Sequence, residues 1–417
     1  MTDPQMWADF TALCDLGGRL AGSPSETAAL AWARERLADV PGGLVHDYAV
    51  DYPGWRCHAA RLIGPDGGAL ACTPLLGTAS TAGTSAPVLD LGRGRPEDFE
   101  RHARDIAGRI VMVRHEYPFA AGHVHRRVKL GLAQRMGAAG FLIAHPEPGI
   151  GPVSGSSGRD GGAGIPALGI SAEAAAALRA PADGALPTAQ IVIAADDVAA
   201  QTHMLVLDLP GREPDWIVVS AHLDGHPLGE SAIDNGTGVA VAVALALARS
   251  LAPRLAACPR GLRICLTGAE EWGLVGSRLW LDRMDEVARR RMVLNINLDS
   301  VGGASELTAL TSGLTRLDAW VKDTAARANL PLATHLPLMP NSDHANFAAH
   351  GIPALRLIAG FNAPDSNLRF LLTAADTRDK VSASELAHAL HIATELTWQA
   401  LTAPEHTMRS LAARAPD

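Results

Sequence analysis

Hydrophobic residues in the second half of the chain, from about residue 202, occur as short, nearly continuous runs. Four of these runs read HMLVLDL, DWIVVSAHLDG, GLRICLTG and MVLNINLDSVG. Such runs are typical of parallel strands that are buried on both faces. The clearest helical pattern between them is GTGVAVAVALALARSL, which starts at Gly236. The alternation predicts an α/β fold with a mixed, mostly parallel sheet flanked by helices.

The first half of the chain divides at a stretch of small residues. SPSETAALAWARERLADV predicts a helix that Ser25 caps, and ASTAGTSAP, residues 79–87, predicts a linker. GRIVMVRH and GAAGFLIAH follow as short buried strands on either side of a predicted helix, HRRVKLGLAQRMG. We therefore expect residues 1–78 and 202–417 to form one domain, with residues 79–201 as a smaller inserted domain.

Composition narrows the class of protein. The 417 residues are 47% hydrophobic and 19% charged, which suits one large domain and a smaller one. The net charge of −8 argues against nucleic acid and anionic membranes as partners. No secretion signal or membrane-spanning run is recognisable, and five cysteines without a CxxC pair indicate reduced thiols. We expect a cytoplasmic protein with a small-molecule substrate, and leave a homo-oligomer open.

Acidic residues and a histidine collect where the predicted strands end. In sheets of this class, functional groups lie just beyond the carboxyl ends of the strands. Two adjacent glutamates after GLRICLTG repel each other unless something compensates their charge. The candidates at the four strand ends are His222, Asp224, Asp234, Glu270, Glu271 and Asp299.

A divalent metal gives each of these groups a role. His222 offers a nitrogen ligand, while Asp234 and Asp299 offer oxygens. Asp224 lies two residues after His222, and we predict that its carboxylate accepts the other ring N–H. One of the paired glutamates then binds metal, and its neighbour accepts a proton from a metal-bound water.

Four motifs together resemble the M28 family of zinc aminopeptidases. They are AHLDGHPLGESAIDNGTG, TGAEEWGLVGS, NINLDSVGG and NSDHANFAAHGIPAL, and the inserted segment resembles a protease-associated domain. The resemblance implies that His222, Asp234 and Asp299 hold one metal and that Asp234 and Glu271 hold a second. It also implies that Glu270 is the general base and that the peptide bond after Asp234 is cis.

The chain departs from the family pattern at the second metal site. Family members read roughly His-Thr-Pro-x-Asp-Thr where this chain has LLTAADTRDKV, so Leu372 occupies the histidine position. A leucine cannot bind metal, and the second site keeps only two carboxylates. His344 and His226 are candidate replacements, although a structural role is favoured for each. We expect one loosely held catalytic ion per chain, zinc or manganese.

A basic stretch in the inserted domain is a further candidate. The sequence HEYPFAAGHVHRRVK offers groups that could bind a substrate carboxylate, although the solvated start of a helix is the favoured alternative. Its members are His115, His123, His125, Arg126 and Arg127.

These features predict a metal-dependent hydrolase in which metal-bound hydroxide attacks a carbon bearing nitrogen. The altered second site favours a small-molecule C–N aminohydrolase, and the chain resembles nitroanthranilate aminohydrolases, which release ammonia from an aryl amine. The alternative is an M28-like aminopeptidase or dipeptidase. A non-catalytic binding scaffold is least favoured, because Glu270 and every ligand of the first site are retained. The exact substrate, the metal and the oligomeric state stay open.

Overall fold

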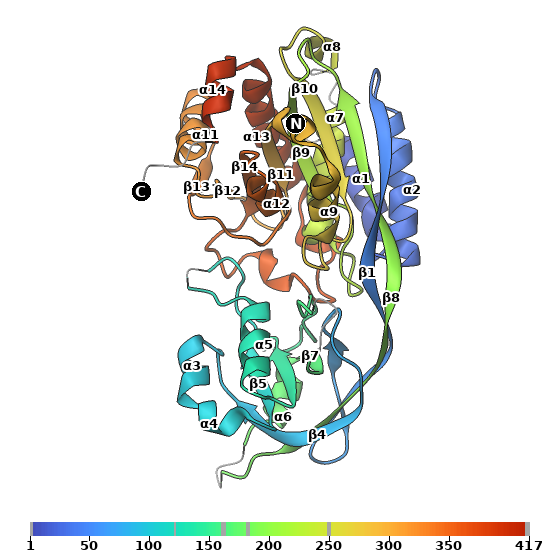
Figure 1. Ribbon diagram of the computed structural model, residues 1–417, viewed down its shortest axis with the longest axis vertical. Coiled ribbons are helices and arrows are strands. Elements are labelled where there is room, and N and C mark those ends of the chain that lie inside the picture. The colour runs from blue at the N-terminus through green and yellow to red at the C-terminus, as the bar shows by residue number, and fades with distance from the viewer. Residues whose placement is uncertain (1–2, 121, 160–163, 181–183, 248–251, 413–417) are drawn as a thin grey trace. The chain divides into compact units, whose positions relative to one another are not determined.

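A computed structural model of the chain describes residues 3–120, 122–159, 164–180, 184–247 and 252–412. The chain forms two compact units (Figure 1). The first comprises Met1–Val50, Gln201–Leu371 and Asp376–Asp417, and the second comprises Asp51–Ala200 and Leu372–Ala375. The boundary predicted after residue 78 falls inside the second unit, whereas the one predicted before residue 202 lies next to Gln201.

The first unit is built on a mixed sheet. Its strands lie in the order β13-β12-β14-β11-β9-β10-β8, and β1 pairs with β8. The central strands β14, β11, β9 and β10 are parallel, whereas β12 and β8 run antiparallel to β14 and β10. The bounds are β1 Leu44–Ile63, β8 Thr188–Leu209, β9 Trp216–His222, β10 Gly261–Thr267, β11 Met292–Leu298, β12 Leu307–Leu310, β13 Leu332–His335 and β14 Ala354–Ala359.

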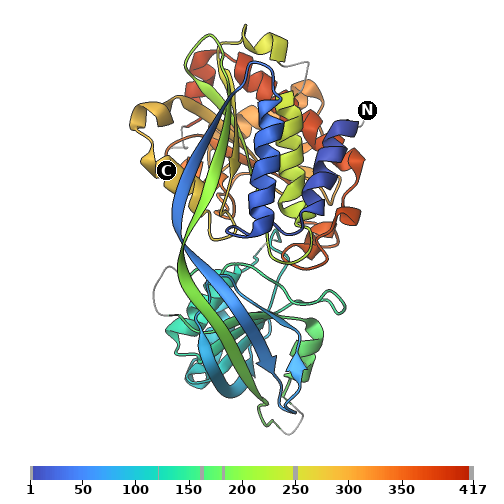
Figure 2. The same ribbon diagram turned by 90° about the vertical axis from the view of Figure 1, so that its right-hand side faces the viewer.

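Helices cover both faces of this sheet. On one face α7 packs against β9, β10 and β11, and it contacts both α1 and α2 (Figure 2). On the other, α9 and α12 contribute Trp280, Leu281 and Phe347 to an apolar cluster with Val218 and Met292 of the strands. The helical bounds are α1 Pro4–Asp15, α2 Pro24–Ala38, η1 Ala232–Gly236, α7 Thr237–Leu247, α8 Ala252–Leu255, α9 Val275–Arg283, α10 Glu286–Arg290, α11 Thr315–Ala328, α12 His344–Ala349, η2 Asn367–Phe370, η3 Arg378–Lys380, α13 Ala383–Thr402 and α14 Glu405–Ser410.

The predicted α/β class is confirmed, with two corrections in detail. The run HMLVLDL forms part of β8, which is antiparallel to β10. Only residues 210–215 join β8 to β9, and so short a connection reverses the chain because a parallel crossover needs many more residues. The predicted helix at α2 is capped by Ser23 and not Ser25, since the Ser23 side chain accepts from the N–H of Glu26. The end of the helix predicted from Gly236, residues 248–251, lies outside the described residues.

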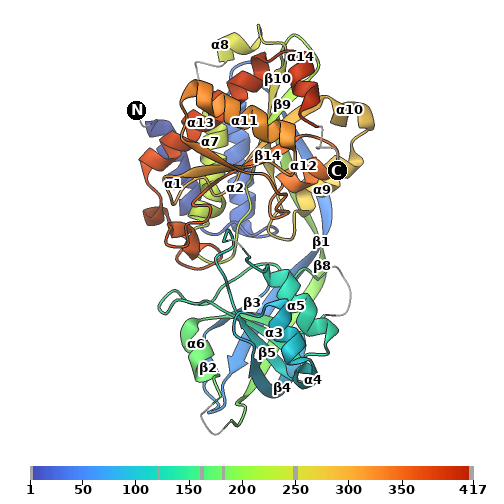
Figure 3. The ribbon, with the colours of Figure 1, turned by 90° about the vertical axis from the view of Figure 1, so that its left-hand side faces the viewer.

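The second unit is a smaller sheet with helices on both sides (Figure 3). Side chains alternate along β5, so Ile110 and Met112 pack with α6 while Val111 and Val113 pack with α3, α4 and α5. Residues 79–87, predicted as a linker, fall largely in β4, because the small and β-branched residues there pair with β8. The bounds are β2 Ala69–Leu70, β3 Cys72–Pro74, β4 Thr81–Asp90, β5 Ile110–Arg114, β6 Gly140–Ala144, β7 Ala167–Ile170, α3 Pro96–Arg101, α4 Ala103–Ile106, α5 Arg126–Arg135 and α6 Ala172–Ala177.

Two predictions from the sequence concern membrane-spanning helices and the state of the cysteines. Across the described ranges, no helix combines the length and the apolar character that crossing a bilayer requires. All five cysteines are free, and Cys14, Cys258 and Cys265 are buried.

Candidate metal centre

The ends of the central strands bring the predicted site residues together in the first unit. His222 is the last residue of β9, Asp299 directly follows β11, and the glutamate pair follows β10. Because β9, β10 and β11 are parallel neighbours, their carboxyl ends meet at one edge of the sheet. Asp234 reaches the same place from η1, immediately before α7.

The first group of candidate ligands centres on the ring of His222. Its Nε2 lies 3.0 Å from Asp234 Oδ1 and 3.6 Å from Asp299 Oδ1. This nitrogen is buried and faces the two carboxylates. On the other side of the ring, Nδ1 lies 3.0 Å from the backbone carbonyl of Asp224, so we assign the proton to Nδ1. A nitrogen lone pair between two carboxylates is the donor set that zinc or manganese takes, and the group fits a divalent metal.

The carboxylate of Asp224 has a different role from the predicted one. It lies 3.8 Å from His222 Nδ1, beyond hydrogen-bond distance, and the backbone carbonyl of Asp224 takes that position. The carboxylate instead accepts from the backbone N–H groups of Glu270 at 3.1 Å and Glu271 at 3.2 Å. Burial raises the pKa of Asp224 to about 8. Asp224 therefore positions the glutamate pair.

The two adjacent glutamates lie in different electrostatic surroundings. Burial, together with the charges of Glu271 and Asp299, raises the pKa of Glu270 well above its usual range despite the attraction of His222. Burial also opposes ionisation of Glu271, but His226 and His222 outweigh it and leave the pKa of Glu271 lowered. Neighbouring carboxylates whose pKa values are pushed apart are suited to separate acid–base roles.

Further contacts fix the two candidate aspartate ligands, Asp234 and Asp299. Arg356 Nη2 lies 3.0 Å from Asp299 Oδ1. Burial opposes ionisation of Asp299, but Arg356 and His222 lower its pKa below the usual range. The carboxylate of Asp376 accepts from the backbone N–H of Ile233 at 2.7 Å and of Asp234 at 3.3 Å. The peptide bond after Asp234 is cis.

A second group of candidate ligands lies beside the first. His226 Nε2 is 2.7 Å from Glu271 Oε1, and both side chains are buried. The candidate ligand atoms of His226, Asp234 and Glu271 all lie within 4.8 Å of one another. His344, the other candidate replacement, is buried but belongs to none of the groups of this kind found among the described residues.

Leu372 and His125 belong to none of these groups, and His125 lies at the start of a helix, as the favoured alternative for its stretch predicted. Leu372 belongs to the second unit, where it packs against an apolar cluster and its carbonyl accepts from the N–H of Ser154. His125 also lies in the second unit, where its Nδ1 accepts from the N–H of Arg127 at the start of α5. The neighbouring His115, His123 and Arg126 belong to that unit too.

Sequence reasoning missed Arg19 and Arg356, both buried, because an isolated arginine carries no motif. The sequence position of His226 did point to the site, because His226 lies four residues after His222 in a glycine-containing loop. A lone histidine with a carboxylate nearby is usually structural, and only the fold brings Glu271 to it.

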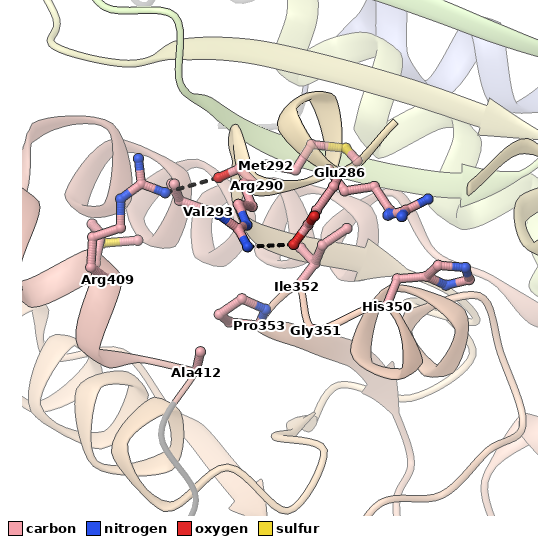
Figure 4. A pocket seen from close by; sticks show the side chains of 12 residues that line it. Glu286, Arg290, Met292, Val293, His350, Gly351, Ile352, Pro353, Arg409 and Ala412 are labelled. Atoms are coloured by element: carbon pink, nitrogen blue, oxygen red, sulfur yellow. Dashed lines mark hydrogen bonds and ion pairs between the residues drawn. The ribbon is translucent and has the colours of Figure 1, made fainter. Parts of the chain in front are cut away.

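The first unit also has a cavity that is separate from the candidate metal centre. It has a volume of about 330 Å³ (Figure 4). Arg290 pairs there with Glu286, and Arg409 donates to the backbone carbonyl of Arg290 at 2.8 Å. None of the predicted metal ligands lines this cavity.

Known proteins resemble both parts of the chain. Residues 205–397 match the model of peptidase family M28, and residues 68–178 match the model of the PA domain. Aminopeptidase YwaD of Bacillus subtilis is 26% identical over 346 residues, covering 80% of this chain and 72% of that protein. A probable lipoprotein aminopeptidase, LpqL, of Mycobacterium tuberculosis is 28% identical over 218 residues, covering 52% of this chain and 40% of that protein.

Two solved structures share the fold over nearly the whole chain. The zinc aminopeptidase BSAP of Bacillus subtilis has a TM-score of 0.74 at 22% identity, covering 98% of this chain and 97% of that one. A peptidase M28 precursor from Shewanella amazonensis has a TM-score of 0.80 at 20% identity, covering 100% of this chain and 96% of that one. At these identities the likeness shows the fold.

Proposed function

We propose that the chain is a metal-dependent aminopeptidase, because residues 205–397 match the model of peptidase family M28 and Aminopeptidase YwaD is similar to 80% of the chain. The observation that carries the proposal is the position of Glu270 beside the ligand group of His222, Asp234 and Asp299. The function favoured from the sequence, a non-peptide aminohydrolase, is not supported by the relatives described above. The relatives described above carry the name aminopeptidase.

The proposed roles follow from the donor groups and their surroundings. When bound, a divalent ion supplies Lewis acidity that polarises the scissile carbonyl and lowers the pKa of water. Glu270 accepts the proton of the attacking water through its carboxylate, whose raised pKa suits a group that must hold and release that proton. Asp224 keeps the Glu270 backbone in place.

The donor groups of the site also bear on the choice of metal. Asp234, Glu270, Glu271 and Asp299 belong to three overlapping groups, each of which contains a histidine. Zinc is the metal we propose, since histidine and carboxylate ligands are those it takes in hydrolytic sites.

Comparing blocked and unblocked substrates tests the proposal. Zinc-loaded and manganese-loaded protein should cleave aminoacyl anilides and dipeptides that have a free amino group. The same anilides with an acetylated amino group are the matched control and should not be cleaved. Ammonia release from small aryl amines, without anilide cleavage, would overturn the proposal in favour of an aminohydrolase.

A further inference from the structure

The loop that follows β9 carries a second histidine into the site. His226 Nε2 lies 2.7 Å from Glu271 Oε1, and the His226 side chain is only 3% exposed. Asp234 completes the set, with its candidate ligand atom within 4.8 Å of those of both His226 and Glu271. Asp234 also belongs to the group formed with His222 and Asp299, so its carboxylate is common to both groups.

The loop that carries His226 is anchored on several sides. The side chain of the fully buried Arg19 donates to the backbone carbonyls of Leu223, Glu230 and Ser231, each at 2.9 Å. The N–H of His226 donates to Ser231 Oγ at 3.0 Å.

Close packing of the backbone adds to these bonds. A Cβ atom on Gly18 would lie 1.9 Å from the carbonyl oxygen of His226, so only glycine allows the two segments to approach this closely. The position of His226 is therefore fixed by its own loop and by the Gly18–Arg19 segment. Metal ligands require this kind of support.

The second group repeats the donor chemistry of the first. Each combines one imidazole nitrogen with two carboxylates, and Asp234 is shared between them. A shared carboxylate between two such groups is the arrangement that holds two metal ions a few ångströms apart. Divalent ions also compensate buried carboxylates, whose burial without a partner is costly.

We propose that His226, Asp234 and Glu271 form a second zinc site, in which His226 supplies the nitrogen ligand that is missing at position 372. The inference rests on the proposed metallo-aminopeptidase function. It replaces the expectation of one ion per chain, which followed from the leucine at position 372. His226, Asp234 and Glu271 all belong to the first unit.

Metal stoichiometry tests the proposal. Protein loaded with zinc and passed through gel filtration should retain about two ions per chain in the wild type and about one in His226→Ala. His203→Ala is the matched control, because His203 also pairs with a carboxylate, Asp47, within the first unit. It should retain the wild-type zinc content.

A second variant and a second measurement guard against misfolding of His226→Ala. His226→Gln preserves side-chain bulk, and chelator titration of the wild type should remove zinc in two steps but from this variant in one. A single step in the wild type, or a second ion retained by both His226 variants, would overturn the proposal. Neither of those outcomes changes the expected cleavage of aminoacyl anilides. Wild-type protein that cleaves no anilide would instead contradict the proposed function.

Discussion

The carboxylate of Asp224 accepts a hydrogen bond of 3.1 Å from the backbone N–H of Glu270. Its other oxygen accepts from the N–H of Glu271 at 3.2 Å. The turn that carries both glutamates is thereby tied to the loop that follows β9, and the backbone carbonyl of Asp224 orients the ring of His222. One residue thus positions a proposed ligand and the proposed base without contacting the reacting atoms.

Asp224→Asn should lower kcat while zinc content stays close to wild type. The amide keeps the shape of the side chain but offers one acceptor oxygen in place of two, so one glutamate N–H loses its partner. Loss of such an orienting contact typically costs about 10- to 100-fold. Steady-state kinetics on an aminoacyl anilide measures the effect, with the exposed Asp196→Asn as control. Unchanged kcat would show that the contact does not position Glu270.

Glu270→Gln should lower kcat about 10²- to 10⁴-fold, the usual contribution of a general base. Glutamine has nearly the same shape but cannot accept the proton. Zinc content should be nearly unchanged, because Glu270 belongs to neither of the two ligand groups that share Asp234, although its carboxylate lies within 4.8 Å of the candidate ligand atoms of His222 and Glu271. Glu286→Gln, which alters an exposed side chain, controls for the substitution itself. A variant that turns over like the wild type excludes Glu270 as the base.

The strand ends could be predicted from the sequence because each run of apolar residues is long enough to define a buried strand. The predicted positions of His222 and Asp299 follow directly from the ends of β9 and β11. The partner of the Asp224 carboxylate could not be predicted. Whether the Asp224 carboxylate binds His222 or the glutamate N–H groups depends on how two loops pack together. The periodicity of apolar residues carries no information on that packing.

His222→Ala and Asp234→Ala should each lose zinc and activity. His222 gives the first group its only imidazole, and Asp234 belongs to both groups, so its loss should affect both ions. His125→Ala should keep its zinc, because His125 lies in the second unit at the start of α5. Zinc analysis after gel filtration measures the outcome. Full retention by Asp234→Ala would remove Asp234 from the ligand set.

Leu372→His should lower the melting temperature without raising zinc content. The leucine side chain packs against the apolar cluster of the second unit, and an imidazole there exchanges apolar contacts for a polar group, at a cost of about 1–3 kcal/mol. Thermal unfolding and zinc analysis on the same sample measure both effects. Leu371→His, which alters the preceding buried residue, shows the cost of an imidazole in the first unit. A gain of zinc in Leu372→His alone would mean that position 372 reaches the metal site.

The role of Arg19, which anchors the loop that carries His226, could not be predicted from the sequence. Arg19 lies more than 200 positions from the three carbonyls of this loop that it binds. Nothing in the residues around it distinguishes a buried arginine from a surface one, and most arginines are exposed. The same holds for Arg356 beside Asp299, whose role depends on the parallel pairing of β11 with β14.

Arg19→Lys should destabilise the first unit and loosen the second zinc ion more than the first. The guanidinium is fully buried and binds three carbonyls of one loop, whereas a single ammonium cannot reach all of them from one point. Leaving buried carbonyls without donors should cost on the order of 3 kcal/mol.

The loop would then hold His226 less firmly. Chelator should therefore remove the zinc next to His226 faster, while the zinc next to His222 leaves at nearly the wild-type rate. Chelator kinetics and thermal unfolding measure the two effects, with Arg36→Lys, whose ion pairs are partly exposed, as control. Equal acceleration of both zinc ions would show that Arg19 stabilises the fold without positioning His226.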